Sequence, residues 1–200
     1  MNKSVDFYFD VGSPAAYLAW QRLPRICEET GAVLVYKPML LGGVFQATGN
    51  QSPMSIPAKG RYLMSDLARF ARRDGVAFRH NPFFPINTLT LMRGVCGLQM
   101  KDAARMVPYA DAVYRAIWRD ATDMNDAAVV AGVLGQAGFD PAALLALAGD
   151  PEVKERLKAQ TMEAVARGVF GAPTFFVGEE MYWGQDRLDF VRQALGEDPK

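Results

Sequence analysis

The chain has 200 residues, half of them hydrophobic, and its 22 lysines and arginines are matched by 22 aspartates and glutamates. This size and apolar content predict one ordinary core, in one domain or in one domain with an insertion. The balanced charge provides no overall field for nucleic acid or for an anionic membrane surface, so we expect neither as a partner. No apolar run approaches the roughly 18 residues that span a bilayer, and no signal segment is recognisable. We therefore expect a cytoplasmic protein.

Two cysteines and one histidine limit the available chemistry. Cys27 and Cys96 lie far apart in apolar, helix-like stretches, which predicts buried free thiols in a reducing compartment. The single histidine, His80, excludes a His-rich metal site and disfavours a Ser-His-Asp triad. We expect no metal site, and His80 is predicted to lie in a polar loop.

Two apolar runs near the N-terminus predict strands on either side of a helix. Val5–Phe9 and Val33–Tyr36 have strand character, and Ala15–Glu29 between them has the helical spacing of apolar residues. Pro14 suits the first helical position, where no amide donor is needed, and Gly31 ends the helix. A strand-helix-strand unit of this size predicts two parallel strands.

The middle of the chain, from residue 61 to 167, has helical patterns and no strand-like run. The predicted helices span residues 60–74, 88–100, 103–119, 125–137, 141–148 and 151–167. Strands return at Thr174–Val177 and Glu180–Tyr182, where the tight Gly178-Glu179 turn is typical of a hairpin. A last helix is predicted over residues 186–195.

This order of elements predicts an α/β protein with a thioredoxin-like fold and a large all-helical insertion. The thioredoxin-like domain is expected to comprise residues 1–60 and 168–200. The inserted helical domain is expected to comprise residues 61–167.

Ser13 lies where the first predicted strand meets the first helix. Unpaired backbone amides and the positive end of the helix dipole meet there and favour an anion such as a thiolate. Thioredoxins carry two cysteines in the corresponding turn, whereas this chain reads Ser13-Pro14-Ala15-Ala16. That difference excludes dithiol redox chemistry in the turn and favours a bound thiol as the reactant. A serine that only caps the helix is the alternative.

Ala172-Pro173 precedes a predicted strand, where a cis peptide bond is accessible because the second residue is proline. A cis bond is expected to direct the N–H and C=O of Ala172 toward an extended ligand, which would add like a further strand. A trans proline at the start of a strand is the alternative.

The run Trp183-Gly184-Gln185-Asp186 opens the last predicted helix, where helix amides are unpaired. These amides and Gln185 offer donors for a carboxylate, and Asp186 offers a partner for an ammonium group. A glutamate-like zwitterion carries both groups. Ordinary capping by Asp186, with Trp183 in the core, explains the same residues equally well.

Two loops add candidate ligand contacts. In the long irregular segment of residues 49–60, Asn50 and Lys59 offer an amide and a cation for a bound carboxylate. In residues 81–87, two phenylalanines are predicted to form an apolar surface, and Asn87 offers a polar group beside it. Inert packing of either loop is an equally consistent interpretation.

Taken together, these segments resemble the family of 2-hydroxychromene-2-carboxylate isomerases and kappa-class glutathione transferases, with the DsbA-type oxidoreductases as more distant relatives. The resemblance extends over nearly the whole chain. It is carried by Asp6-Phe7-Tyr8-Phe9-Asp10 with Ser13-Pro14, Gly49-Asn50 with Pro57-Ala58-Lys59-Gly60, Val169-Phe170-Gly171-Ala172-Pro173-Thr174, and Met181-Tyr182-Trp183-Gly184-Gln185-Asp186-Arg187-Leu188.

The resemblance implies glutathione as the cofactor, with Ser13 as the catalytic residue that activates its thiol. It assigns glutathione binding to Ser13, Asn50, Lys59, Ala172, Pro173, Trp183, Gly184, Gln185 and Asp186. It assigns substrate binding to Phe45, Asn50, Ser55 and Asn87. The sequence departs from related isomerases near Phe45, where those enzymes have a basic residue.

The function implied by this resemblance is a glutathione-dependent isomerase of 2-hydroxychromene-2-carboxylate or a similar aromatic 2-oxo acid, in the catabolism of aromatic compounds. Reversible thiolate addition, bond rotation and elimination form the implied mechanism, and a homodimer is the implied assembly. A kappa-like glutathione transferase, which consumes glutathione, is the first alternative. A non-catalytic glutathione- or peptide-binding relative of DsbA is the second.

Overall fold

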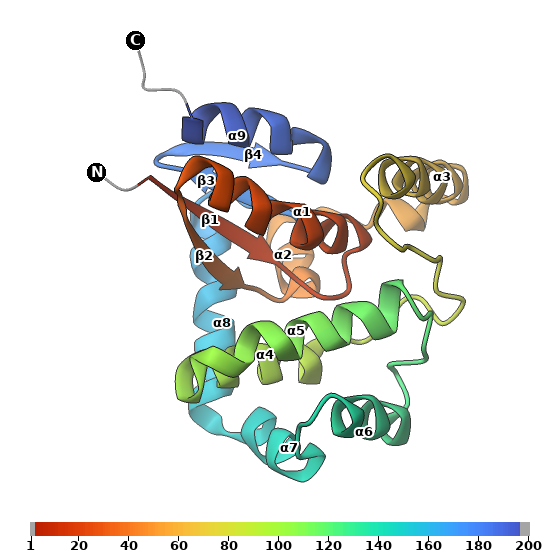
Figure 1. Ribbon diagram of the computed structural model, residues 1–200. Helices are drawn as coiled ribbons and strands as arrows, with labels where there is room; N and C mark the ends of the chain where they lie inside the picture. Colours follow the sequence, from red (N-terminus) through yellow and green to blue (C-terminus); the bar gives the residue numbers. More distant parts are fainter. Residues whose placement is uncertain (1–2, 197–200) are drawn as a thin grey trace.

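The computed structural model describes residues 3–196, which form a four-stranded mixed sheet surrounded by helices (Figure 1). Its elements are β1 (Ser4–Phe9), α1 (Pro14–Thr30), β2 (Val33–Pro38), α2 (Leu41–Thr48), the 3-10 helix η1 (Pro53–Ser55), α3 (Pro57–Arg73), α4 (Leu89–Lys101), α5 (Ala103–Trp118), α6 (Ala127–Gln136), α7 (Pro141–Gly149), α8 (Pro151–Ala166), β3 (Thr174–Val177), β4 (Glu180–Trp183), the 3-10 helix η2 (Gln185–Arg187) and α9 (Leu188–Gly196). This architecture confirms the predicted thioredoxin-like fold with its helical insertion.

The sheet has the strand order β2-β1-β3-β4. β1 pairs in parallel with β2, as the strand-helix-strand pattern predicts, and β3 forms the predicted antiparallel hairpin with β4. β3 also lies antiparallel to β1, with Phe175 directly opposite Phe7 and the two rings 5.3 Å apart. This pairing joins segments far apart in sequence and places the end of β1 beside the loop that precedes β3.

Alternating side chains of β1 enter two different apolar clusters because successive residues of a strand point to opposite faces. Phe7 and Phe9 belong to the main core, which also contains helix α1. Tyr8 belongs to a smaller cluster on the other face, with Val44 of α2 and Phe176 of β3. The sheet is therefore covered on both faces.

The inserted helices share the main core with the sheet. Figure 1 shows α4, α5, α6 and α7 grouped below the sheet, with α8 running from this group back to it. Tyr114 of α5 packs against Trp20 of α1 at 5.2 Å between ring centroids, and both belong to the same cluster as Phe9. The helical segment thus packs directly against the thioredoxin-like part, and the division into two domains stays a prediction.

The segment between residues 41 and 60 differs from the expectation. An unpredicted helix, α2, follows β2, and α3 begins at Pro57 rather than at residue 60. The paired glycines of α2 and its short length left no clear helical pattern. As a result, the segment of residues 49–60 is less irregular than expected, and Lys59 lies in the first turn of a 17-residue helix.

A charged network anchors the end of α8 to the sheet. The Arg167 guanidinium donates to Asp6 Oδ2 at 2.6 Å and to the Tyr8 hydroxyl at 2.9 Å, and it stacks on the Phe176 ring at 3.9 Å. Tyr8 donates in turn to Glu163 Oε1 at 3.1 Å. The segment from Arg167 to β3 therefore starts from a fixed point.

Cys27 and Cys96 are both buried and free, and burial raises the pKa of each thiol to about 11.

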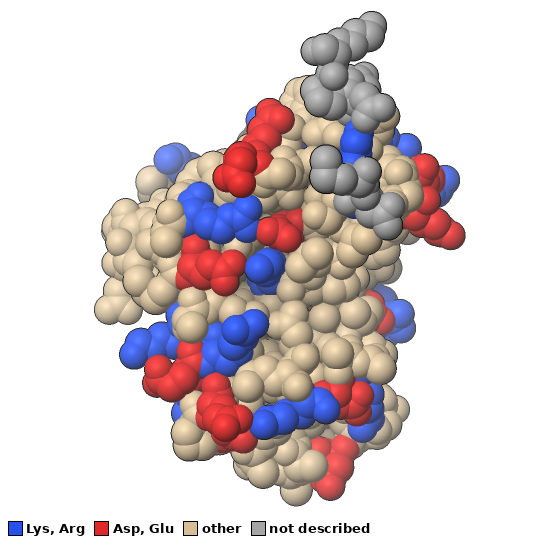
Figure 2. Space-filling view, turned by 90° about the vertical axis from the view of Figure 1, so that its left-hand side faces the viewer, with Lys and Arg blue, Asp and Glu red and all other residues tan. Residues whose placement is uncertain are grey.

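No single described helix is long and apolar enough to cross a membrane; α6 and α7 meet that criterion only as a pair bent by 119°. On the face shown in Figure 2, acidic and basic side chains are intermixed.

Candidate functional site

Ser13 caps helix α1 at the end of the turn that follows β1. Its backbone N–H donates to the Asp10 carbonyl at 3.0 Å, and its Oγ accepts from the Ala16 N–H at 3.1 Å. The residue is 4% exposed, and the first turn of the 17-residue helix contains no acidic residue. No acidic side chain of that first helical turn therefore offsets the positive end of the helix dipole near Ser13 Oγ.

The loop before β3 faces Ser13. The Ala172–Pro173 peptide bond is cis, as expected from the sequence. The Ser13 hydroxyl donates to the Ala172 carbonyl at 3.1 Å, and Thr174 Oγ1 donates to the Gly171 carbonyl at 2.8 Å. Among the described residues, none accepts a hydrogen bond from the Ala172 N–H. The carbonyl of Ala172 is thus used by Ser13, and its N–H is the group left for a ligand.

Trp183 and Gly184 are attached to the same loop. The Gly184 N–H donates to the Pro173 carbonyl at 3.0 Å, and the Trp183 indole packs on the Phe170 ring at 5.0 Å between centroids. A Cβ at Gly171 would lie 2.6 Å from Trp183 Nε1, so any other residue there would displace the indole. Trp183 is 47% exposed, which contradicts the alternative that it is a core residue.

Gln185 and Asp186 differ in their exposure. Gln185 is buried, and its Oε1 has no hydrogen-bond donor among the described residues, which is uncommon for a buried polar atom. The carboxylate of Asp186 is half-exposed and pairs with Arg187 Nη1 at 2.6 Å. Neither side chain caps the short helix η2, so the capping alternative is also wrong.

Asn50 is hydrogen-bonded to the same loop. Its Nδ2 donates to the Phe170 carbonyl at 2.8 Å, and its Oδ1 accepts from the Gln51 N–H at 2.8 Å. Asn50 therefore helps to hold the cis-proline loop. Lys59 is exposed, and no carboxylate of the described residues pairs with it. A cation in the first turn of a helix opposes the helix dipole, so Lys59 adds positive potential where the amides already provide it.

The three remaining residues that were predicted to bind the substrate lie on α2, on η1 and just before α4. Phe45 is half-buried in α2, and Ser55 is exposed in η1. Asn87 is exposed, accepts from the Leu89 N–H at 3.2 Å and so supports the start of α4. Within residues 3–196, none of these three side chains is hydrogen-bonded to Ser13. Their role in substrate binding stays a prediction.

Asp10 supports this site, although its role was not expected from the sequence. It is 2% exposed, and its carboxylate accepts from the Gly12 N–H at 2.9 Å, the Leu41 N–H at 2.8 Å and the Thr88 hydroxyl at 3.2 Å. Burial raises the pKa of this carboxyl, although the three hydrogen bonds act in the opposite direction. Asp10 thus ties the Ser13 turn to the starts of α2 and α4.

Two aromatic residues of α5 hold the backbone of the same turn. The Tyr114 hydroxyl donates to the Asp10 carbonyl at 3.2 Å, and Trp118 Nε1 donates to the Val11 carbonyl at 2.9 Å. Both side chains are fully buried. From the sequence they could be recognised as core residues of an amphipathic helix, but not as hydrogen-bond donors to a turn about a hundred residues earlier.

Comparison with known proteins gives the same picture over the whole chain. A sequence model of the DsbA-like thioredoxin domain matches residues 4–196. A 2-hydroxychromene-2-carboxylate isomerase of Sphingobium xenophagum is 32% identical over 98% of this chain and 99% of its own length, and one of Pseudomonas sp. strain C18 is 35% identical over 98% and 91%. Human glutathione S-transferase kappa 1 is 25% identical over 98% and 92%.

Solved structures extend this likeness. A 2-hydroxychromene-2-carboxylate isomerase superimposes with a TM-score of 0.85 at 33% identity, covering 96% of this chain and 94% of that one. The cytosolic disulfide reductase DsbM from Pseudomonas aeruginosa, solved with GSH, has a TM-score of 0.63 at 15% identity, covering 96% and 93%. At that identity, the second likeness shows a shared fold.

Proposed function

This chain belongs to the family of DsbA-like thioredoxin domains, and on that basis we propose that it is a glutathione-dependent isomerase of 2-hydroxychromene-2-carboxylate or a similar aromatic 2-oxo acid. The observation that carries the proposal is Ser13. It stands at the N-terminus of α1, against the cis-proline loop, in a turn without cysteine. Relatives named 2-hydroxychromene-2-carboxylate isomerase, at 32–35% identity over nearly full length, support the same interpretation.

Three groups of the site fit glutathione. The Ala172 N–H, which has no acceptor among the described residues, suits the peptide backbone of an extended ligand. Lys59 and the N-terminal amides of α3 suit a carboxylate. The Asp186 carboxylate, paired with Arg187, suits an ammonium group. The relatives named as kappa-class glutathione transferases are a further support.

When bound, glutathione supplies a thiolate whose reversible addition to the conjugated double bond allows that bond to rotate before elimination. The chain's task is to favour thiolate over thiol. We propose that the Ser13 hydroxyl turns from the Ala172 carbonyl to donate to the sulfur, which the α1 dipole also stabilises. Lys59, and the amide of Asn50, are proposed to orient the carboxylates of glutathione or substrate and to stabilise charge that develops during the reaction.

The test is to follow the ultraviolet absorbance of 2-hydroxychromene-2-carboxylate with and without glutathione while the free thiol is measured in the same reaction. We expect isomerisation that requires glutathione and leaves its concentration unchanged. Stoichiometric loss of the thiol would assign the chain to the glutathione transferases instead. Binding of glutathione without turnover of any chromene carboxylate would favour the non-catalytic alternative.

A second measurement tests the glutathione site separately. Because a ligand that binds only the folded state stabilises it, glutathione is expected to raise the melting temperature. Asp186→Ala should reduce this shift. Asp189→Ala, which removes a nearby exposed carboxylate of α9, should not. Equal shifts in both variants would remove Asp186 from the site.

The proposal includes a homodimer in the cytoplasm. Analytical ultracentrifugation measures the assembly state.

A further inference from the structure

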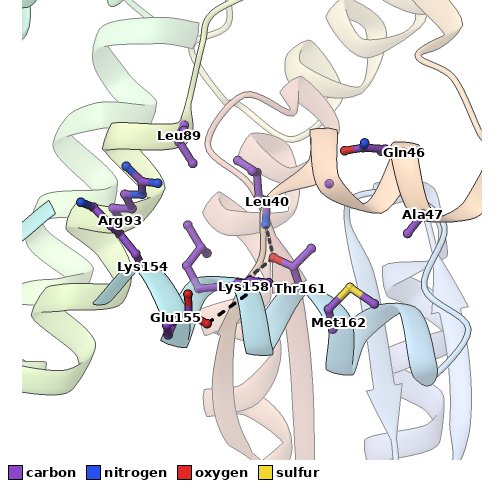
Figure 3. Close-up of a pocket in the computed structure, with 12 residues that line it drawn as sticks. Leu40, Gln46, Ala47, Leu89, Arg93, Lys154, Glu155, Lys158, Thr161 and Met162 are labelled. Atoms are coloured by element: carbon purple, nitrogen blue, oxygen red, sulfur yellow. Dashed lines mark hydrogen bonds and ion pairs between the residues drawn. The ribbon is translucent and has the colours of Figure 1, made fainter. Parts of the chain in front are cut away.

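A cleft of about 520 Å³ lies between α2, α4 and α8 (Figure 3). Its volume is in the range of small-molecule sites, which is about 300–1,000 Å³. Its walls include Leu40, Leu89 and Leu157. None of the residues assigned to glutathione or to the substrate lines it.

The two ends of the cleft differ in polarity. Figure 3 shows Arg93 of α4 and Lys154 of α8 at one end, beside Leu89, and Ala47 and Met162 toward the other. The ligand-sized space between them is bounded by leucine side chains. A molecule that fills the cleft therefore meets cations at one end, and the Gln46 amide together with apolar groups toward the other.

The cations of the cleft are incompletely neutralised. Three basic side chains line it, Arg93, Lys154 and Lys158, against one acidic side chain, Glu155. Glu155 lies 3.9 Å from Lys158, at the outer limit of an ion pair. Among the residues that the structure describes, no carboxylate pairs with Arg93 or Lys154. Two neighbouring unpaired cations beside an apolar wall are complementary to an anion with an apolar body.

The polar group in the wall between them is already satisfied. The Thr161 hydroxyl donates to the Leu157 carbonyl at 2.7 Å and accepts from the Leu40 N–H at 3.0 Å, so its proton is already used within the protein. It makes no demand on a ligand. The specificity of the cleft thus comes from the two cations at one end, and from the apolar surface with the Gln46 amide toward the other.

We propose that this cleft is a second ligand site, which binds an organic carboxylate with an apolar body. The carboxylate lies between Arg93 and Lys154, and the apolar body lies along Leu40 and Leu157 toward Met162. The proposal does not depend on the isomerase activity, because it uses none of the residues of the Ser13 centre.

The test is isothermal titration calorimetry of the full chain with 2-naphthoate, with octanoate, and with uncharged 2-naphthamide. We expect saturable binding of at least one of the two carboxylates, at least tenfold tighter than that of the amide. The double variant Arg93→Gln/Lys154→Gln should weaken carboxylate binding at least tenfold. Arg156→Gln is a control for the effect of one positive charge, which it removes from the exposed surface of the same helix α8 outside the cleft.

A further variant separates the cleft from the Ser13 centre. Lys59→Met should leave the affinity for the probe within twofold of the wild type. If Lys59→Met weakens binding and the double variant does not, the acid binds at the Ser13 centre and the proposal is wrong. Equal losses in Arg156→Gln and in the double variant, or no saturable binding of either carboxylate by the wild type, would also overturn it.

Discussion

The Ser13 turn and the segment of residues 49–60 both contribute to the candidate site, but they are built in opposite ways. Asp10 and Ser13 are buried, and the backbone of their turn is bound by side chains of α5. Asn50 and Lys59 are exposed, and Asn50 is joined to the site by one hydrogen bond to the Phe170 carbonyl. The core therefore fixes the proposed reacting group, whereas the residues proposed to contact the ligand are exposed to solvent.

This contrast predicts a separation of effects. Substitutions among the supports of the turn should lower the free energy of unfolding. Substitutions in the exposed segment should change ligand binding and leave the fold almost as stable as before, because surface changes are usually within about 0.5 kcal/mol.

Trp118→Ala should be the most damaging of these substitutions. Trp118 is fully buried, packs on Phe78 and Phe84, and donates to the Val11 carbonyl. Its loss should lower the free energy of unfolding by about 3–5 kcal/mol, as measured by urea denaturation. Trp183→Ala is the control, because this tryptophan is exposed and should cost much less. Similar losses in the two variants would contradict the distinction between the regions.

Ser13→Ala should affect the reaction more than the binding of glutathione. Without the hydroxyl, the pKa of the bound thiol should rise, and turnover near neutral pH should fall by about tenfold or more, since one pKa unit is about 1.4 kcal/mol. The glutathione contacts proposed for Ala172 and for the run from Trp183 to Asp186 remain, so the dissociation constant of glutathione should change little. Ultraviolet titration of the bound thiolate measures the thiol pKa when the pH is varied, and the dissociation constant when the glutathione concentration is varied. Unchanged turnover and thiol pKa would reduce Ser13 to a helix cap.

Lys59→Met should raise the Michaelis constant for glutathione or for the substrate by up to about tenfold, which corresponds to roughly 1.4 kcal/mol of lost charge-assisted binding. The free energy of unfolding should stay within about 0.5 kcal/mol of the wild type. Arg61→Met removes an exposed charge from the same helix and serves as the control. If both constants are those of the wild type, Lys59 is a solvated charge and has no ligand.

A pH dependence from Asp10 should be the weakest of these effects. Burial raises its pKa above the ordinary 3.8, so the folded chain binds this proton more tightly than the unfolded chain. The resulting stabilisation is complete below pH 3.8 and is lost as the pH rises through the higher pKa of the folded state. The stability of the wild type relative to Asp10→Asn should therefore fall with rising pH, as measured by urea denaturation from pH 4 upward. A difference that is flat or rises with pH would contradict a raised pKa.

Elements with local signals could be predicted from the amino-acid sequence alone. The apolar run Val5–Phe9, the helical spacing that follows Pro14 and the Gly178-Glu179 turn predicted β1, α1 and the β3–β4 hairpin, because these patterns depend on residues only a few positions apart. Serine in place of cysteine at Ser13 is likewise a local feature, and it is sufficient to favour a bound thiol as the reactant. The glycines of α2 weakened the local signal, and this helix was not predicted.

The assembly of the site depends instead on tertiary packing. Ser13 meets the Ala172 carbonyl 159 residues away, and the Asp10 carboxylate meets Leu41 and Thr88 at separations of 31 and 78 residues. A sequence pattern does not show which distant donors will surround a buried carboxylate, because that depends on how the sheet and the inserted helices pack together. For the same reason, the core position of Trp118 was readable from its helix, but its hydrogen bond to Val11 was not.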